Sequence, residues 1–194
     1  MIMVLDAGQA EVDLAAGVLA CPRCGGALRP WSWAAARPVR RLDGSIWRVR
    51  PRRARCRACG STQVLLPAGC LPRRGDAAEV VDAALLAKAG GAGHRAIAAE
   101  LGRPPATVRR WLRAVRGRHA AWLRAQGVEH AHRLDPETLA DLPAQPSALG
   151  DALAALGTAV GACRRRLHSH APAWALITMF TRGRLLWPAP APSG

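Results

Sequence analysis

Apolar residues recur at helical spacing in the middle of the chain, within residues 93–117. One stripe at positions i, i+3, i+4 and i+7 consists of Val108, Trp111, Leu112 and Val115. Before it, Gly102 suits a left-handed turn and Pro105 suits the first turn of a helix. A shorter apolar run with Ile97 and Ala98 precedes that turn. The pattern therefore predicts two helices joined by a tight turn, a helix-turn-helix.

A further helix is predicted just upstream, at residues 76–89. Asp76 with Glu79 three positions later has the form of a capping box, so we expect Asp76 to be the N-cap. The apolar positions of this segment would pack on the helical pair. They are Val80, Val81, Ala84 and Leu85. Residues 75–127 are thus predicted to contain a three-helix unit. A short helix over residues 118–127 is predicted to follow it and to end near Gly127.

A hairpin pattern lies closer to the N-terminus. Segments 27–33, 38–42 and 45–56 are predicted strands, and Asp43 and Gly44 between the last two form a strong hairpin turn signal. The segments lie between two Cys-x-x-Cys-Gly motifs. We therefore expect a long hairpin inside a unit that spans residues 18–72.

Two cysteine pairs flank that hairpin. Thiolates from four residues can occupy the corners of a tetrahedron around zinc, with Zn–S bonds of about 2.3 Å. The four are Cys21, Cys24, Cys56 and Cys59. Gly25 and Gly60 follow the second cysteine of each pair, where a positive φ angle closes the turn. A redox Cys-x-x-Cys is the competing interpretation, but it needs a βαβ context and leaves one pair unexplained.

The sequence therefore predicts a zinc ribbon with one structural Zn²⁺. Four cysteines close the coordination shell, whereas a catalytic zinc keeps an open position. We expect no enzymatic activity from this centre. Cys70 and Cys163 are given no role.

The C-terminal region, residues 128–187, is predicted to be helical. Residues 147–167 carry an apolar stripe, and residues 172–186 are almost entirely apolar. These helices either form a surface for a protein partner or a homodimer, or cover the chain's own core. Residues 1–17 are a lead-in, and the proline-rich residues 188–194 are a predicted disordered tail. The expected fold class is mainly α with a small β zinc ribbon.

Composition and charge narrow the class of partner. The formal net charge is +15, and 27 of the 28 basic residues are arginine. Such a balance favours a polyanion, either nucleic acid or an acidic membrane surface. A GC-rich genome can explain the choice of arginine but not the scarcity of acids. No signal peptide or membrane-length apolar run is evident, so we expect a soluble, cytoplasmic protein without a membrane partner.

The positive charge is concentrated on the two motifs. In the second predicted helix of the helix-turn-helix, an arginine-rich face lies opposite the apolar stripe and suits a DNA major groove. The expected DNA-contacting residues are Arg103, Thr107, Arg109, Arg110, Arg113 and Arg116, with Arg50, Arg52 and Arg53 of the ribbon on phosphates. The competing interpretation is a solvated surface on an ordinary helical hairpin.

The order of these motifs resembles a known group of proteins. A cysteine pair, an arginine-rich hairpin, a second pair, the stretch "LLPAGCLPRR" and a helix-turn-helix are similar to an uncharacterised family of high-GC bacteria, catalogued as a domain of unknown function. The layout also resembles the N-terminal DNA-binding part of insertion-sequence transposases. The resemblance covers a little over half of the chain. It implies that the four cysteines are zinc ligands and that residues 105–116 are the DNA reader.

The chain departs from those transposases after Arg118. The five acids that remain lie within 23 residues and have no strand pattern around them. A strand-transfer domain needs well over a hundred residues of α/β structure, so transposase activity is not expected here. We expect a non-catalytic, zinc-stabilised DNA-binding protein without a small-molecule substrate, acting as a transcription regulator or a mobile-element accessory. The alternatives are a zinc-ribbon protein–protein adaptor and a transposase remnant.

Overall fold

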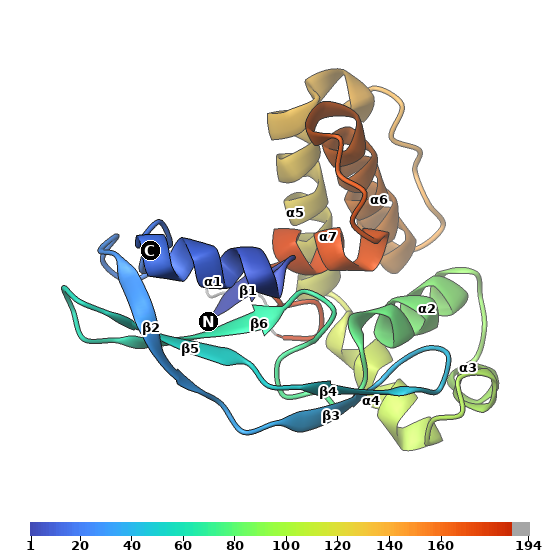
Figure 1. Ribbon diagram of the computed structural model, residues 1–194. Helices are drawn as coiled ribbons and strands as arrows, with labels where there is room; N and C mark the ends of the chain where they lie inside the picture. The colour runs from blue at the N-terminus through green and yellow to red at the C-terminus, as the bar shows by residue number, and fades with distance from the viewer. Residues whose placement is uncertain (188–194) are drawn as a thin grey trace.

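The computed structural model describes residues 1–187, and the predicted disordered tail at 188–194 lies outside them. A four-stranded sheet with the order β1-β6-β5-β2 forms one end of the molecule (Figure 1). Its strands are β1 (Ile2–Val4), β6 (Thr62–Pro67), β5 (Arg52–Cys56) and β2 (Leu28–Trp33). Only β1 runs parallel to its neighbour, β6; the other pairs are antiparallel.

Residues 1–17 are part of this fold, which the sequence pattern did not predict. After β1, helix α1 (Ala7–Ala16) starts at the N-cap Asp6, whose carboxylate accepts the amide of Gln9, and ends at Gly17 with φ +73°. Figure 1 shows α1 lying across one face of the sheet. Ala10 and Leu14 of α1 pack there against Leu28 and Leu65. The predicted lead-in thus supplies an edge strand and the cover of one sheet face.

The predicted hairpin is present in two antiparallel parts. Strands β2 and β5 pair at the base, with a bulge between Pro30 and Ser32. Further out, β3 (Arg37–Arg40) pairs with β4 (Ile46–Val49) around the turn at Gly44, where φ is +83°. The hairpin signal at Asp43 and Gly44 is confirmed.

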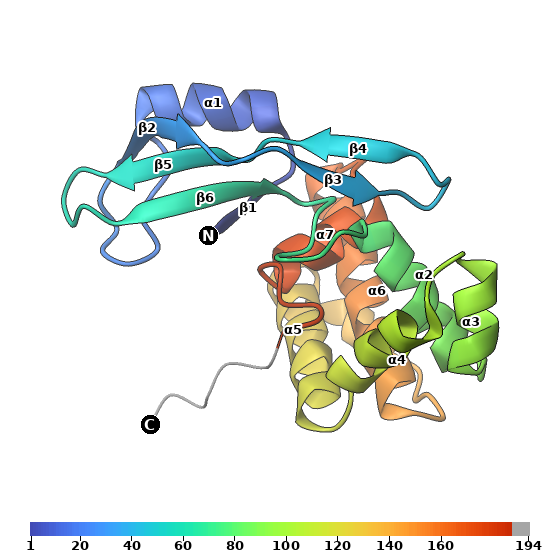
Figure 2. The same cartoon turned by 90° about the horizontal axis from the view of Figure 1, so that it is seen from below.

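The hairpin is also hydrogen-bonded to the segment that leads into α2 (Ala78–Ala89). The amide of Arg40 donates to the carbonyl of Gly75, and the amide of Ala77 donates to the carbonyl of Arg40, both at 2.8 Å. Figure 2 shows β3 and β4 beside the start of α2. The ribbon and the helices are therefore joined by backbone pairing.

Helices α2, α3 (His94–Glu100) and α4 (Pro105–Ala114) form the predicted three-helix arrangement. Gly102 has φ +59° in the turn between α3 and α4, as predicted. The capping-box prediction is wrong, because α2 begins later. Ala77 is its N-cap without a side-chain hydrogen bond, and the carboxylate of Asp76 instead binds Arg103. Glu79 accepts hydrogen bonds from the amide of Leu42 and from Arg41 in the hairpin.

The C-terminal helices are α5 (Arg118–Leu134), α6 (Ala148–Leu167) and α7 (Ala173–Phe180), with a 3₁₀ turn η1 (Pro136–Leu139) between the first two. The predicted helix end near Gly127 is wrong, since α5 continues past it and the division at residue 127 falls inside one helix. A Cβ on Gly127 would lie 2.5 Å from the backbone of Ala155 in α6, so this glycine lets the two helices touch. The N-cap of α6 is Ser147, at the start of the predicted helical segment.

Two clusters of buried apolar side chains result. The small one lies between α1 and the sheet and includes Cys21 and Cys56. The large one runs from Met3 and Val39 through the helices to Leu186. Within residues 1–187 there are seven α-helices and six strands, so the fold is mixed and its β part exceeds a small ribbon. In this part of the chain, no helix combines the length and apolar character needed to cross a membrane.

Helix α2 carries Asp82, whose carboxyl group is largely buried, so that its charged form is disfavoured. Burial raises the pKa of Asp82 to about 6, from its ordinary value of 3.8. The folded state therefore binds this proton more tightly than the unfolded chain does. The resulting stability is present below the unfolded pKa and is lost as pH rises through about 6.

Replacing this carboxyl group tests that dependence. We expect Asp82→Asn to be more stable than the parent near neutral pH, by roughly 2 kcal/mol. The advantage should shrink as pH falls through the window between the two pKa values. Urea unfolding across this pH range measures it. A gain that is equal at every pH would show that the charge of Asp82 is not its cause.

Candidate metal centre and nucleic-acid interface

Two matching backbone turns hold the four cysteines. In the first, the amide of Gly25 donates to the carbonyl of Cys21 and the amide of Cys21 to the carbonyl of Gly26. In the second, the amide of Gly60 donates to the carbonyl of Cys56. Gly25 and Gly60 have φ of +74° and +70°, the left-handed region that favours glycine. The spacing Cys-x-x-Cys-Gly thus folds locally as the sequence predicts.

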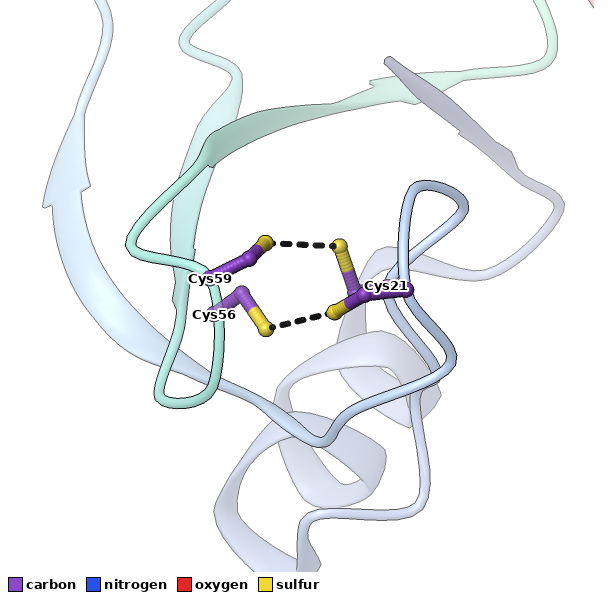
Figure 3. A group of neighbouring side chains, drawn as sticks. Cys21, Cys56 and Cys59 are labelled. Atoms are coloured by element: carbon purple, nitrogen blue, oxygen red, sulfur yellow. Dashed lines mark hydrogen bonds between the residues drawn. The ribbon is translucent and has the colours of Figure 1, made fainter.

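The thiols of both turns converge on one point (Figure 3). The Sγ atoms of Cys21 and Cys59 are 3.8 Å apart, and those of Cys24 and Cys56 are 3.5 Å apart. All four Sγ atoms lie within 4.8 Å of one another. A tetrahedron with Zn–S bonds of about 2.3 Å has S–S edges of about 3.8 Å. The cluster therefore has the size of a zinc site.

The surroundings shift the thiols in opposite directions. Despite a hydrogen bond with the backbone of Gly26, the neighbouring thiols of Cys59 and Cys56 raise the pKa of Cys24, whereas the ionised forms of Cys21 and Cys59 are favoured. A hydrogen bond with the hydroxyl of Ser61, followed by one with the backbone of Arg23, lowers the pKa of Cys21 to about 6. Hydrogen bonds with Ser61 also lower the pKa of Cys59. Because the thiolate is the form that binds metal, Ser61 supports the donor set. Ser61 lies outside the Cys-x-x-Cys-Gly spacing, so the motif alone does not indicate it.

Gly26 makes room for the centre. A Cβ at this position would lie 2.9 Å from the Cβ of Ala58 in the opposite turn and 3.3 Å from the Sγ of Cys56. The second glycine of the first motif therefore lets the two turns approach. Cys70 and Cys163 are buried elsewhere in the large cluster. Among residues 1–187, the four predicted ligands are the one group of His, Cys, Asp or Glu side chains placed to hold a metal.

Helix α4 has two distinct faces. Val108 and Trp111 are 0% and 1% exposed and pack in the large cluster, together with Leu112 and Val115. The opposite face is exposed and carries Arg109, Arg110 and Arg113, with Arg116 just after the helix end. Thr107 in the first turn is half-buried. The structure thus brings together five of the six residues predicted on this element.

The four guanidinium groups of this face are uncommitted. Within residues 1–187, none of them makes a side-chain hydrogen bond or ion pair with the protein. Arg74 adds a fifth charge beside Arg110. Burial and then the charge of Arg110 lower the pKa of Arg74. The prediction missed Arg74, because the stretch between β6 and α2 shows no periodic pattern that would place it.

Unlike the other residues predicted to contact DNA from the helix-turn-helix, Arg103 is buried and bound by protein groups. Its side chain is 9% exposed, and its Nε donates to the Asp76 carboxylate at 2.6 Å. Its Nη1 donates to the carbonyl of Leu101, and its Nη2 to the carbonyl of Arg41 at 3.4 Å. Arg103 therefore ties together α2, the α3–α4 turn and the hairpin. It is not free to bind a ligand.

The three arginines predicted to contact phosphates from the hairpin also differ: one is engaged inside the fold and two are exposed. Arg52 is bound by the carboxylate of Glu11 at 2.8 Å and donates to the carbonyl of Ser32. Arg50 and Arg53 are exposed. The guanidinium of Arg50 lies 5.9 Å from the ring centroid of Trp33. Of the three predicted ribbon contacts, two remain accessible.

One family model matches the part of the chain that holds the cysteine pairs and helices α2 to α4. Residues 21–111 match the family model described as "Domain of unknown function (DUF6431)". This segment starts at Cys21, the first cysteine of the candidate metal site, and ends within α4. It supports the predicted resemblance to an uncharacterised family, whereas the resemblance to transposases stays a prediction. No curated protein and no solved structure matches the chain.

Proposed function

We propose that this chain is a non-catalytic, zinc-stabilised DNA-binding protein in which α3 and α4 form a helix-turn-helix and α4 reads the duplex. One observation carries the proposal. The exposed face of α4 presents Arg109, Arg110 and Arg113, with Arg116 just past the helix end, and none of the four has a protein partner within residues 1–187, while the opposite face of α4 is packed in the core. Some arginines elsewhere are engaged by carbonyls or carboxylates, among them Arg37, Arg52 and Arg103. Free guanidinium groups on a rigid helix are available to a polyanion.

The spacing on α4 fits a groove. Arg109 and Arg113 are four residues apart, so they lie one turn apart on the same face. A helix of this kind fits the major groove, where arginine can bind guanine O6 and N7 together. Arg110 and Arg74 flank this face and suit phosphates. The alternative of a solvated surface does not account for the absence of acids from α4.

The rest of the fold supports a fixed orientation of α4. Arg103 links the α3–α4 turn to α2 and to the hairpin through Asp76 and the carbonyl of Arg41. Zinc closes the base of the same ribbon. We propose that Arg50 and Arg53 meet phosphates there, and that Arg103 and Arg52 hold the structure in place of contacting DNA. Four cysteines around the metal favour a structural role over catalysis.

The cellular role proposed is transcription regulation or assistance to a mobile element. The paired motifs suit both. A zinc-ribbon adaptor that recruits a protein through the C-terminal helices is the competing proposal, and the following binding experiment separates the two.

Duplex binding by variants of α4 tests the reader. We expect Arg109→Ala and Arg113→Ala each to cost about 1–3 kcal/mol on a preferred duplex and to relax sequence preference at one position. Arg53→Ala should weaken all duplexes alike and reduce the salt slope by about one. Isotherms on a preferred and a random duplex at two salt concentrations give both quantities.

Arg124→Ala is the matched control, since it removes an exposed arginine from α5 without touching α4. It should bind both duplexes as the parent does. If the two α4 variants also bind every duplex as the parent does, α4 is not a reader and the adaptor proposal replaces it.

A further inference from the structure

Part of one face of the four-stranded sheet, over β2, β5 and the start of β6, lies open beside the zinc centre, whereas Met3 of β1 and Leu66 of β6 on the same face are buried in the large cluster. Helix α1 covers the other face, toward which Ala54 and Cys56 of β5 point. Because side chains alternate along a strand, Arg53 and Arg55 of β5 point to the open face, and both are exposed. Figure 2 views the molecule from below, the side away from α1. We call this surface, formed by Trp31, Arg53 and Arg55 with Thr62 of β6, the open sheet face.

Trp31 is the aromatic residue of this face. It is the extra residue in the bulge of β2, between Pro30 and Ser32, and 57% of its surface is exposed. The guanidinium of Arg55 lies 4.9 Å from its ring centroid. This cation–π contact orients the indole while the side chain stays open to solvent. An indole held in this way offers a flat π surface to a ligand.

Trp33, two residues further along β2, provides a contrast. It pairs in register with Arg52, whose guanidinium lies 4.7 Å from its ring centroid and also binds Glu11 of α1. Trp33 therefore belongs to the α1 side of the sheet and has an acid nearby. The two tryptophans differ in setting although both are exposed.

The charge of the open sheet face selects a polyanion. Between residues 21 and 74 the one acid is Asp43, which lies in the β3–β4 turn and binds Ser45. Neither Arg53 nor Arg55 makes an ion pair within residues 1–187. Arginines two residues apart on a strand are separated by about 6.6 Å, and such a row can follow consecutive phosphates. An acidic protein surface would pair with the arginines alone, whereas a nucleic acid can use both the arginines and the exposed indole of Trp31.

We propose that the open sheet face binds single-stranded nucleic acid, with an unpaired base stacked on Trp31 and the adjoining phosphates on Arg53 and Arg55. In a duplex the bases are stacked on one another and only their edges are accessible, so a protruding indole finds no π partner there. An unpaired base presents its face. Stacking on an aromatic side chain accepts any base, so this site does not depend on sequence. It goes beyond the proposed function: it shares Arg53 with the proposed duplex phosphate contacts, but Trp31 and Arg55 have no part in them, and the site does not require α4 to read DNA.

Single-strand binding of tryptophan variants tests the proposal. The probes are a fluorescently labelled oligothymidylate, an oligouridylate of the same length and a duplex of random sequence. Trp31→Ala should weaken binding of one or both single strands about tenfold or more. It should leave duplex binding unchanged, and Trp31→Phe should retain most of the single-strand affinity. Comparing the oligothymidylate with the oligouridylate shows whether the site binds DNA, RNA or both.

Trp33→Ala is the matched control on the same strand and should bind single strands as the parent does. Arg109→Ala should also leave single-strand binding intact, so failure of the α4 proposal is seen separately, in the duplex arm. Each variant is first checked for one equivalent of zinc and an unchanged helical signal. If Trp31→Ala binds both single strands as the parent does, or weakens duplex and single strands equally, the stacking site is contradicted.

Discussion

Cys56→Ser is expected to lose the bound zinc and, with it, the ordered ribbon. The residue supplies one of four convergent thiols, and its backbone closes the second turn. Metal binding contributes about 10 kcal/mol or more to the folding of small zinc units, so its loss exceeds what the small α1–sheet core can offset. Metal analysis should find one equivalent of zinc in the parent and little in the variant. The far-ultraviolet signal of the helices should largely remain.

Two matched controls are available in the same chain. Cys70→Ala and Cys163→Ala remove buried cysteines that lie outside the metal cluster. Both should keep one equivalent of zinc, although the lost packing lowers their stability. Full zinc retention in Cys56→Ser and Cys59→Ser alike would contradict the assignment of these ligands.

Asp76→Ala is expected to lower the free energy of unfolding strongly, second only to the loss of a zinc ligand. Asp76 and Arg103 are 11% and 9% exposed, and removing the carboxylate leaves a buried guanidinium without its counter-ion. Breaking such a pair costs about 3–5 kcal/mol. The loss should loosen the junction between the hairpin and the α3–α4 turn. Urea unfolding of the purified protein measures the change in free energy.

Glu129→Ala is the control for this experiment. It breaks the exposed Arg133–Glu129 pair in α5, which should contribute about 0.3–0.5 kcal/mol. The double variant Asp76→Leu with Arg103→Met should recover much of the lost stability, since no buried charge is then unpaired. If Asp76→Ala is no less stable than Glu129→Ala, the ion pair does not hold the junction together.

The local parts of this structure could be predicted because short motifs determine them. The two Cys-x-x-Cys-Gly turns, Asp43 and Gly44, and the Gly102 turn each have a backbone requirement that the nearby residues meet. The same holds for the buried stripe on α4. Such features depend on a few neighbouring residues, and the structure places them as the pattern indicates.

The parts that depended on distant contacts could not be predicted. Strand β1 has only three residues, and its partner β6 lies about sixty residues away. Gly127 was interpreted as a helix end, but its role is to let α5 approach α6. Asp76 matched a capping box, yet Arg103 binds its carboxylate. In each case a tertiary contact overrode the local signal.

In the candidate site, too, local motifs could be predicted and tertiary contacts could not. Sequence reasoning selected arginines by motif and could not tell which are engaged inside the fold. Arg52 and Arg103 are bound by carboxylates, whereas Arg109 and Arg113 have no partner in the described part of the chain, residues 1–187. Trp31 was not selected, because its place in a bulge on the open sheet face depends on the register of β2 with β5.

Selection of bound duplexes from a random pool tests the central claim most directly. If α4 reads DNA, the parent protein should enrich a defined sequence that contains guanines in the major groove, and Arg109→Ala with Arg113→Ala should lose that preference while retaining weak, salt-sensitive binding. Equal recovery of all sequences by the parent and the double variant, or no recovery by either, would contradict the account.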